Sequence, residues 1–368
     1  MLSADYYNLL IGQGYGPFTG VPCALVKGLI SHVEEAGDSR YFIASSEGEA
    51  MGIAGGLALA GRTPVVMMQN DGYGNAINPL SSLQLVYHLP ALLLITWRAE
   101  PGAKPDAIQH HLMGETLMRL LDTFNIPHRL IEDDLRISEE QLRQAKSYLD
   151  SEGKPFALIV RRGIFSDGPR SSSKADPAKP IRLDYINVLA EEVGESSILL
   201  GTTGFTGREL QQAIDRPGTF YTAGSMGCIG SLGLGIATEN SDRIIYVLDG
   251  DGALLMKMGT LATIGHYQPA NLVHILFDNG QYESTGGQPT VSRSTNFTMV
   301  AEGCGYAGTE IVDDLAAFRK FIQAHRNFDG PVLCHVKVQP GTLPDLKRPS
   351  DGPVELRDQF RNFLGIHG

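Results

Sequence analysis

Asp251 and Asn279 are two oxygen-bearing side chains that follow neighbouring apolar runs of the sequence. Asp251 lies in a Gly-Asp-Gly turn after the run Ile244–Leu248, and Asn279 follows the run Leu272–Phe277. Such runs are typical of buried strands, and a helical pattern lies between them. A carboxylate and a carboxamide at the tips of two adjacent strands can share one hard cation. The glycine after Asp251 begins a helix, whose N–H groups favour a diphosphate. The spacing therefore predicts a cation that joins the protein to a diphosphate.

The size and charge of the chain favour an acidic, two-domain enzyme. Its 368 residues are enough for two domains, each with its own core. Thirty Lys and Arg residues against 41 Asp and Glu residues give a net charge of −11, so we expect neither nucleic acid nor anionic membranes as partners. The longest apolar run, Leu89–Trp97, is too short to span a bilayer. No signal-peptide pattern begins the sequence, and the four cysteines form no CxxC pair, so we expect a cytoplasmic protein.

A polar, Pro- and Ser-rich segment divides the sequence into two halves. We predict a first domain over residues 1–165, a linker over 166–181 and a second domain over 182–368. In both halves apolar runs alternate with amphipathic stretches, which predicts an α/β fold with parallel sheets flanked by helices. The predicted strands are Tyr41–Ala44, Pro64–Gln69, Pro90–Trp97, Phe156–Arg161, Ser197–Leu200, Arg243–Leu248, Leu272–Phe277 and Val332–Val338.

A short pattern recurs in the two halves. Residues 51–59 and 226–234 share Met, Gly, Gly, Leu and Leu at matching positions, and each copy precedes a strand that ends in a Gly-rich turn. Gly- and Ala-rich helices can resemble one another by composition alone. Because the order of elements also repeats, we favour two related domains. Their small-residue faces would allow close helix packing in a dimer.

The turn at Asp251 with the spaced Asn279 resembles the cofactor signature of thiamine-diphosphate enzymes. The resemblance implies that Asp251 and Asn279 bind Mg²⁺ through their side chains and Gln281 through its carbonyl. It also places Glu47, after a strand and at the start of a helix, on the pyrimidine ring of the cofactor. This chain has Asp278 where the family usually has a first Asn. The remaining cofactor residues that the resemblance implies are Thr203, Gly224 (a carbonyl on the aminopyrimidine), Met226 (an apolar wedge), Gly250 and Gly252.

More of the sequence is similar to the phosphonopyruvate decarboxylases. This resemblance implies two thiamine-diphosphate-binding-type domains, pyrimidine-binding and diphosphate-binding, and the conversion of 3-phosphonopyruvate to phosphonoacetaldehyde and CO₂. It also implies at least a homodimer, in which Glu47 of one subunit faces the diphosphate domain of another. The similar segments are residues 18–22, 46–50, 68–70, 74–80, 96–98, 100–102, 224–228, 247–252 and 284–288.

Glu47 can be interpreted either as a catalytic carboxylate or as a helix-terminal carboxylate without a role in chemistry. Thiamine catalysis needs a carboxylate that moves a proton on and off the pyrimidine, and the Gly/Ala/Leu helix behind Glu47 offers it an apolar pocket. A carboxylate at a helix N-terminus is also common without any chemistry. The turn at Asp251 favours the catalytic interpretation.

The substrate must be held by groups that suit a carboxylate and a phosphonate or sulfonate. Arg98 ends a strongly apolar strand, and its planar guanidinium fits a tetrahedral oxyanion. Lys104, His110 and His111 follow in a Gly/Pro-rich stretch that could close over a ligand or could simply be a solvated loop. Three further candidates could bind substrate or cap the next helix: Asn70, Asn75 and Asn78.

Two residues depart from the resembled family near this predicted substrate site. Cys23 replaces an Asp that is a candidate proton donor, and Asp71 replaces a usual Ser. Asp71 or a histidine could supply the proton instead. The departures keep three alternatives open: sulfopyruvate decarboxylation, a carboligating 2-keto acid enzyme, and an inactive cofactor-binding partner subunit.

Two other patterns carry less weight. Residues 303–308 spell GxGxxG, but a helical stretch precedes them and an apparent strand follows, so we expect a loop rather than a dinucleotide site. The ten histidines show no paired-ligand spacing for zinc.

Overall fold

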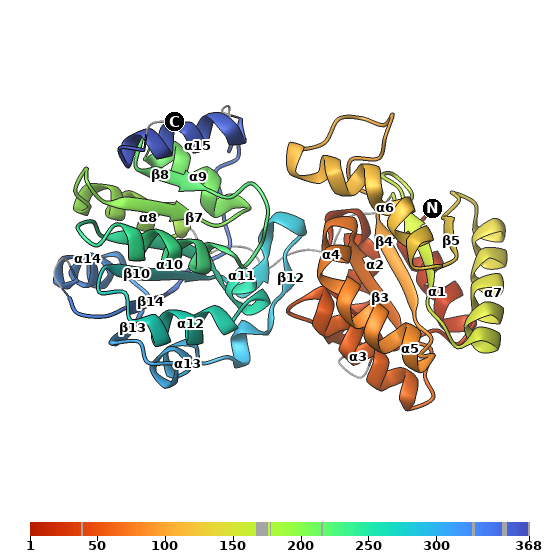
Figure 1. Ribbon diagram of the computed structural model, residues 1–368. Helices are drawn as coiled ribbons and strands as arrows, with labels where there is room; N and C mark the ends of the chain where they lie inside the picture. The colour runs from red at the N-terminus through yellow and green to blue at the C-terminus, as the bar shows by residue number, and fades with distance from the viewer. Residues whose placement is uncertain are drawn as a thin grey trace. The chain divides into compact units, whose positions relative to one another are not determined.

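The computed structural model describes residues 1–37, 40–166, 176, 178–214, 216–325, 328–347 and 352–366. It divides into two compact units (Figure 1). Unit 1 comprises Met1–Ser172 and Ser284–Pro289, and unit 2 comprises Ser173–Glu283 and Thr290–Gly368. Most of the predicted linker lies outside the described residues, so its boundaries remain a prediction.

The sheet of unit 1 has six strands, and every neighbouring pair is parallel. The order across the sheet is β2-β1-β3-β4-β6-β5. The three central strands β3, β4 and β6 are almost wholly buried, as expected for a parallel sheet covered on both faces. The strands are β1 Phe18–Gly20, β2 Tyr41–Ile43, β3 Val65–Gln69, β4 Leu92–Thr96, β5 His128–Leu130 and β6 Phe156–Val160.

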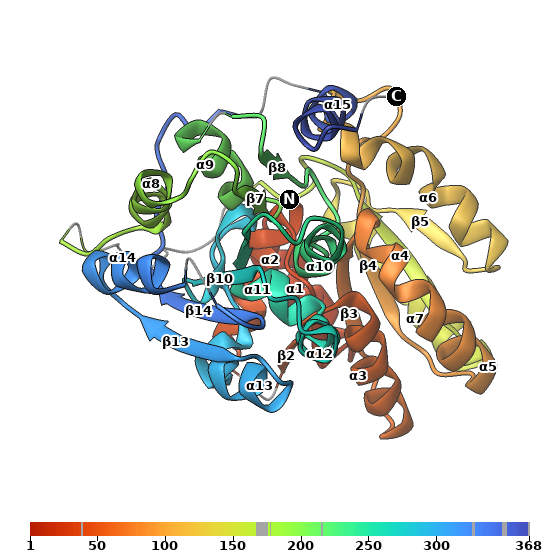
Figure 2. The same ribbon diagram turned by 60° about the vertical axis from the view of Figure 1, so that its left-hand side comes forward.

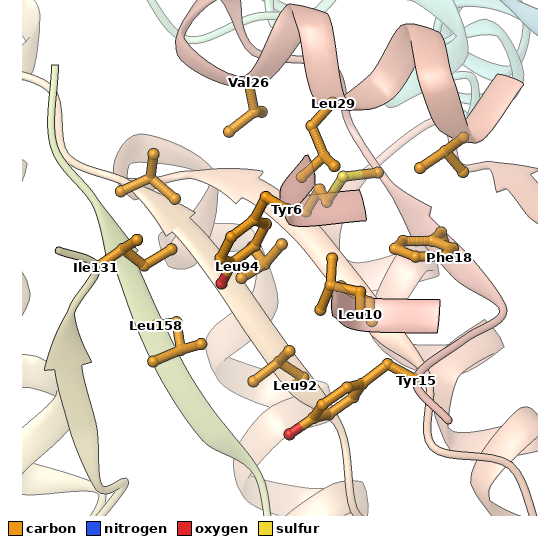
Figure 3. Packing of buried hydrophobic residues seen from close by; sticks show 14 of the residues in the cluster. Tyr6, Leu10, Tyr15, Phe18, Val26, Leu29, Leu92, Leu94, Ile131 and Leu158 are labelled. Carbon is orange, nitrogen blue, oxygen red and sulfur yellow. The ribbon is translucent and has the colours of Figure 1, made fainter. Parts of the chain in front are cut away.

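Helices cover both faces of this sheet. Helices α1, α2 and α7 pack on one face, where Tyr6, Leu10 and Leu29 meet the strand residues Leu92 and Leu94 (Figure 3). Helices α3, α4 and α6 pack on the other face. Each fully buried leucine or phenylalanine contributes about 1.5–3 kcal/mol relative to an exposed one. The helices are α1 Ser3–Gly12, α2 Lys27–Glu35, α3 Glu47–Leu59, α4 Asn70–Pro79, α5 Leu85–Tyr87, α6 His111–Thr123 and α7 Leu135–Glu152, with short helical turns η1 Ala24–Val26, η2 Leu80–Gln84 and η3 Ile108–His110.

Unit 2 contains a second six-stranded parallel sheet, in the order β13-β14-β10-β9-β7-β8. Its central strands β9 and β10 are those predicted on either side of the Asp251 turn. The strands are β7 Ile198–Gly201, β8 Thr219–Tyr221, β9 Ile245–Gly250, β10 Leu272–Asp278, β13 Gly308–Val312 and β14 Val332–Lys337, with a separate small pair, β11 Gln281–Tyr282 and β12 Gln288–Pro289.

The helices of unit 2 also form two layers (Figure 2). Helices α8, α9 and α14 cover one face, and α10, α11, α12, α13 and α15 contribute to the other. The single helix expected over 253–267 is wrong: the structure has α11 and α12 instead, because Lys257 leaves helical geometry with φ −135°. The helices are α8 Arg182–Glu192, α9 Phe205–Ala213, α10 Ile229–Glu239, α11 Asp251–Met256, α12 Gly259–Tyr267, α13 Phe297–Gly303, α14 Leu315–Ala324 and α15 Pro353–Phe363, with short turns η4 Glu283–Thr285 and η5 Val291–Ser294.

The two sheets have the same topology. Numbered along the chain within each unit, the six strands of either sheet lie in the order 2-1-3-4-6-5. This agreement supports the inference, first drawn from the repeated Met-Gly pattern, that the two α/β units are related.

The GxGxxG pattern lies where a loop was expected. Helix α13 ends at Gly303 and β13 begins at Gly308, so the motif joins a helix to a strand. A dinucleotide site needs the opposite order. All four cysteines are free. Among the helices that the structure describes, none is both long and apolar enough to cross a membrane.

Candidate active site

In each unit the candidate residues follow the carboxyl ends of adjacent strands. Because the first and third strands are neighbours and the chain leaves them in opposite directions, this edge is a topological switch point, where α/β sheets bind ligands. In unit 1, Cys23 follows β1 and Asp71 follows β3. In unit 2, Thr203 follows β7 and Asp251 follows β9.

Glu47 is the first residue of α3, and it is buried with 5% exposure. The Ser46 Oγ caps the helix by accepting a hydrogen bond from the Glu49 amide, an interaction worth about 1 kcal/mol. The Asn75 Nδ2 donates to Glu47 Oε2 at 2.8 Å. A buried carboxylate at a helix N-terminus is favoured by the helix dipole. Asn75 therefore holds the predicted catalytic carboxylate in place, which is a role that its sequence position alone did not assign.

Gly72 leaves room for Glu47. A Cβ atom at residue 72 would lie 2.2 Å from Glu47 Oε1, far inside van der Waals contact. Any side chain larger than hydrogen would therefore displace the Glu47 carboxylate.

Asp71 and His110 form a pair in unit 1. The His110 Nδ1 lies 2.8 Å from Asp71 Oδ2, and the two side chains are 13% and 29% exposed. An aspartate at Nδ1 favours the tautomer with its proton on that nitrogen, so Nε2 is the nitrogen left for exchange with a ligand. Asp71 is thus paired with a histidine rather than with Lys or Arg.

Arg98 is engaged by a carboxylate that follows it in the sequence. Its Nε and Nη2 both donate to Asp106, each at 2.6 Å, and Arg162 Nη2 donates to the same carboxylate at 3.1 Å. Hydrogen bonding to Arg98 holds the pKa of Asp106 well below its usual range. Two donors of the Arg98 guanidinium are therefore already occupied, and Nη1 is the group that Asp106 leaves to an anion.

The other substrate candidates of unit 1 have different surroundings. The Asn70 side chain bonds twice to the main chain of Arg98, at 3.0 and 3.1 Å, and it caps no helix. It therefore fixes the path of the chain at Arg98. The His111 Nε2 lies 3.1 Å from the Asp106 carbonyl oxygen. Lys104 is exposed in a turn. Asn78 accepts a hydrogen bond from Ser82 within its own helical region.

Cys23 is buried at the end of β1. Its Sγ lies 2.9 Å from Thr96 Oγ1, and burial raises the pKa of its thiol. A thiol with a raised pKa is a poor substitute for a carboxylic acid. Burial of the Cys23 thiol therefore favours a different group as the proton donor.

Asp251 is the buried carboxylate of unit 2. It is 4% exposed, and Thr290 Oγ1 donates to its Oδ2 at 2.6 Å. Burial raises the pKa of Asp251 to about 6; the Thr290 hydrogen bond opposes this rise and the charge of Asp278 adds to it. A nearby cation would favour the ionised form instead.

A buried ionic network surrounds Asn279. Its Nδ2 donates to Glu283 Oε2 at 3.1 Å, and Arg182 Nη1 donates to the same oxygen at 3.3 Å. Arg182 also bonds through two nitrogens to Glu209, which is fully buried. The Asn279 Oδ1 accepts from the Gln281 amide at 3.0 Å. One arginine against two glutamates leaves one excess negative charge beside Asn279, which favours a cation.

Asp278 fixes the turn that carries Asn279. Its carboxylate accepts from Ser292 Oγ and His335 Nε2, both at 2.8 Å, and from Lys337 Nζ at 2.5 Å. Burial would raise the pKa of Asp278, but these hydrogen bonds hold it below its usual range. Asp278 is therefore fully engaged by protein groups.

The remaining cofactor candidates lie at the same edge of the unit 2 sheet. The Thr203 Oγ1 donates to the Ala223 carbonyl oxygen at 2.9 Å, which ties the end of β7 to the turn that precedes Gly224 and the half-buried Met226. The Gly250 amide donates to Asp249 Oδ1 at 2.9 Å. A Cβ on Gly252, the second residue of α11, would lie 2.6 Å from the Tyr282 ring, so any larger residue there would displace this ring.

The groups at this edge fit a divalent magnesium-like cation. Asp251, Asn279 and the Gln281 carbonyl would offer a carboxylate, a carboxamide and a main-chain oxygen, all hard donors. Over the described ranges, no three His, Cys, Asp or Glu side chains gather as a metal site. The expected magnesium ligands are one carboxylate, Asp251, and two amide oxygens, so the expected site does not need three His, Cys, Asp or Glu side chains. Burial is the largest cause of the raised pKa of Asp251.

Sequence reasoning missed several residues that shape these sites. Neither Asp106 nor Thr290 was singled out from the sequence. Arg182, Glu209 and Glu283 lie far apart in the sequence and carry no motif. A buried arginine between two glutamates has no sequence signal, because each residue alone is typical of a solvated helix face.

Comparisons with known proteins identify the class. Residues 201–336 match the family described as "Thiamine pyrophosphate enzyme, C-terminal TPP binding domain". This range contains Thr203, Gly224, Asp251 and Asn279. The fold and this match define a thiamine-diphosphate enzyme.

Relatives along the whole chain define the family more closely. The chain is 36% identical to a phosphonopyruvate decarboxylase of Streptomyces viridochromogenes, over 98% of this chain and 94% of the relative. It is 35% identical to a phosphonopyruvate decarboxylase of Streptomyces hygroscopicus, over 99% and 94%. A sulfopyruvate decarboxylase of Methanosarcina acetivorans is 30% identical, over 94% and 93%. The chain belongs to the phosphonopyruvate decarboxylase family.

Proposed function

We propose that this chain decarboxylates 3-phosphonopyruvate to phosphonoacetaldehyde and CO₂, with thiamine diphosphate and Mg²⁺ as cofactors. The observation that carries the proposal is that both halves of the expected site are assembled in one chain. In unit 1 the buried Glu47 accepts a hydrogen bond from Asn75, and glycine at residue 72 leaves room for it. In unit 2 the buried Asp251 follows β9, and Asn279 follows the neighbouring strand β10. The phosphonopyruvate decarboxylases at 35–36% identity support the choice of substrate.

Thiamine diphosphate, when bound, supplies the nucleophilic carbon and the electron sink that decarboxylation needs. Asp251, Asn279 and the Gln281 carbonyl would hold Mg²⁺, and the N–H groups at the start of α11 would be available to the diphosphate. Glu47 holds and returns a proton at the pyrimidine ring, with Asn75 fixing its Oε2. Loss of CO₂ leaves a carbon that must take up one proton per turnover.

The Asp71–His110 pair is the group that we assign to that protonation. Asp71 holds Nδ1, so Nε2 of His110 delivers the proton, and Cys23 takes no part because its thiol is buried with a raised pKa. The substrate phosphonate meets Arg98 through Nη1, with Lys104 and His111 in the adjoining segment 99–111. Asn70 acts on the substrate only through the main chain of Arg98.

A CO₂-release assay with and without thiamine diphosphate and Mg²⁺ tests the proposal. Glu47→Gln should still bind the cofactor but lose about 10²- to 10⁴-fold in turnover. Asp251→Ala should lose Mg²⁺-dependent cofactor binding. Equal turnover by Glu47→Gln and the parent would refute the mechanism. No CO₂ from any 2-keto acid, with the cofactor bound, would instead favour the inactive-subunit alternative.

Sulfopyruvate is the rival substrate, and the relative from Methanosarcina acetivorans supports keeping it in the test. Sulfonate and phosphonate are both tetrahedral oxyanions, so Arg98 suits either. Both keto acids should therefore be compared on one preparation. Faster release of sulfoacetaldehyde would overturn our choice. Formation of a longer hydroxyketone in the presence of an acceptor aldehyde would favour carboligation.

We also propose self-association, with each site completed by Glu47 of one copy and Asp251 of another. Glu47→Gln and Asp251→Ala preparations, each inactive alone, should then complement when they are mixed. Random exchange in a dimer gives one intact site in half of the molecules, or about a quarter of the parent activity. A mixture that exchanges subunits yet stays inactive would argue against sites shared between copies.

A further inference from the structure

A cavity in unit 2 lies outside the residues expected to bind the cofactor. It has a volume of about 250 Å³, the space of roughly eight waters. Its lining comes from the end of η5, the start of α13 and the last residues of β13 and β14. This is the carboxyl edge of the sheet, but on the two strands beyond β10. Three of its residues are basic: Arg293, His335 and Lys337.

The positive charge of this cavity is only partly neutralised. Lys337 and His335 both donate to Asp278, so one carboxylate serves two basic groups. Arg293 is exposed, and within the described ranges its guanidinium has no ion-pair partner. The atoms that a Cβ on Gly280 would meet include Arg293 Nε at 3.6 Å, so the arginine lies against the turn after Asp278. A net positive charge remains for a ligand.

His335 is the buried group that points to a ligand. The residue is 2% exposed, and its Nε2 is held by Asp278, whereas its buried Nδ1 has no hydrogen-bond partner among the described residues. Leaving such a nitrogen unpaired costs about 1–3 kcal/mol. The hydrogen bond from Nε2 to Asp278 leaves Nδ1 with a lone pair, which the P–OH group of a monoprotonated phosphate or phosphonate can satisfy by donating to it.

The other polar groups of the cavity are compatible with an acceptor ligand. The Asn296 Oδ1 caps α13 by accepting from the Met299 amide, which leaves its Nδ2 to donate. The hydroxyls of Ser294 and Thr295 already donate to the Val291 carbonyl oxygen. The donors that remain are a guanidinium, an ammonium and a carboxamide, which together match a tetrahedral oxyanion.

We propose that this cavity is a second anion site, which binds phosphate or the phosphonate or phosphate group of a small metabolite. It is separate from the diphosphate site predicted at Gly250–Gly252. Lys337 of this cavity also donates a hydrogen bond to Asp278. An anion bound to Lys337 would therefore affect the turn that carries Asn279. The proposal does not depend on which keto acid the protein decarboxylates.

Inorganic phosphate is the probe, and calorimetry on protein held in excess thiamine diphosphate and Mg²⁺ is the measurement. We expect one saturable site in the low-millimolar range or tighter, weakened about tenfold or more by Arg293→Met. Arg361→Met removes the same charge from the exposed face of α15 and should bind as the parent does. Methylphosphonate should replace phosphate, and acetate should not.

His335 gives an independent readout. Phosphate should shift the ¹⁵N resonance of its Nδ1, because a P–OH donor would then occupy this nitrogen. His335→Gln, which retains a donor toward Asp278, should bind phosphate more weakly. Equal binding by Arg293→Met and the parent, or no saturable binding, would overturn the proposal. Displacement of phosphate by thiamine diphosphate would assign the anion to the diphosphate site. A change in assembly mass on adding phosphate would assign the cavity to a carboxylate of a second copy. Either result would also overturn it.

Discussion

Replacing Gly72 with alanine tests the position of Glu47 without touching its chemistry. The new Cβ would lie 2.2 Å from Glu47 Oε1 and 2.5 Å from its carboxyl carbon. Relief of that overlap needs the carboxylate to move by about 1 Å, and a misplacement of this size costs roughly 10²-fold in rate. The same movement breaks the 2.8 Å hydrogen bond from Asn75. Alanine favours the helix by about 0.8–1 kcal/mol, so a general loss of helix stability is not the expected cause.

Gly74→Ala is the matched control, because a Cβ on Gly74 of the same helix meets no atom within 4 Å. We expect Gly74→Ala to keep the parent rate and Gly72→Ala to lose about two orders of magnitude in CO₂ release. Both variants should bind thiamine diphosphate and show the parent circular dichroism. If Gly72→Ala turns over as fast as Gly74→Ala, then Glu47 is not held by this contact and the geometric argument fails.

Two further predictions concern charge. Glu283→Gln should weaken Mn²⁺ affinity about tenfold, measured by electron paramagnetic resonance, because it removes the excess negative charge beside Asn279. The control Glu195→Gln changes an exposed glutamate and should leave the affinity unchanged. Equal Mn²⁺ affinities of the two variants would contradict this prediction. Burial raises the pKa of Glu34 to about 7, above its unfolded value of 4.5, so its carboxylate lowers stability as pH rises through this window. Glu34→Gln should therefore raise the free energy of unfolding at pH 8 by about 1 kcal/mol, after discounting for partial exposure, and should not raise it below pH 4.5. The control Glu115→Gln changes an exposed glutamate and should not change the stability at either pH. A gain in stability that does not depend on pH would contradict the prediction.

The strands that sequence reasoning found are those with long apolar runs. A parallel strand covered on both faces is apolar throughout, so β4 and β10 are evident in the sequence. Of the four strands with three residues each that the structure describes, only β2 was predicted; β1, β5 and β8 were missed, because so short a segment shows little periodicity. The break between α11 and α12 was also missed, because an apolar pattern continues across it.

The candidate sites divide in a similar way. Asp251 and Asn279 were predicted together because they end strands that are adjacent both in the chain and in the sheet. The pairing of Arg98 with Asp106 depends on the path of the intervening loop, which no local propensity specifies. The network of Arg182, Glu209 and Glu283 forms only where two helices and a turn meet. The sequence alone does not show that these charged residues are buried together.

The shared topology explains why the two sites look alike in position and differ in use. In both sheets the third strand leads directly into a helix whose first turn contains Asp-Gly: Asp71-Gly72 after β3 and Asp251-Gly252 after β9. In both, the glycine admits a neighbouring side chain that a Cβ would exclude, Glu47 in unit 1 and Tyr282 in unit 2. The aspartates differ in partner. Asp71 contacts an imidazole and so suits proton transfer, whereas Asp251 is buried beside the Thr290 hydroxyl and a second carboxylate, Asp278, and so suits a cation. One strand-to-helix junction, present twice, thus accounts for an acid–base half and a metal half of the same proposed reaction.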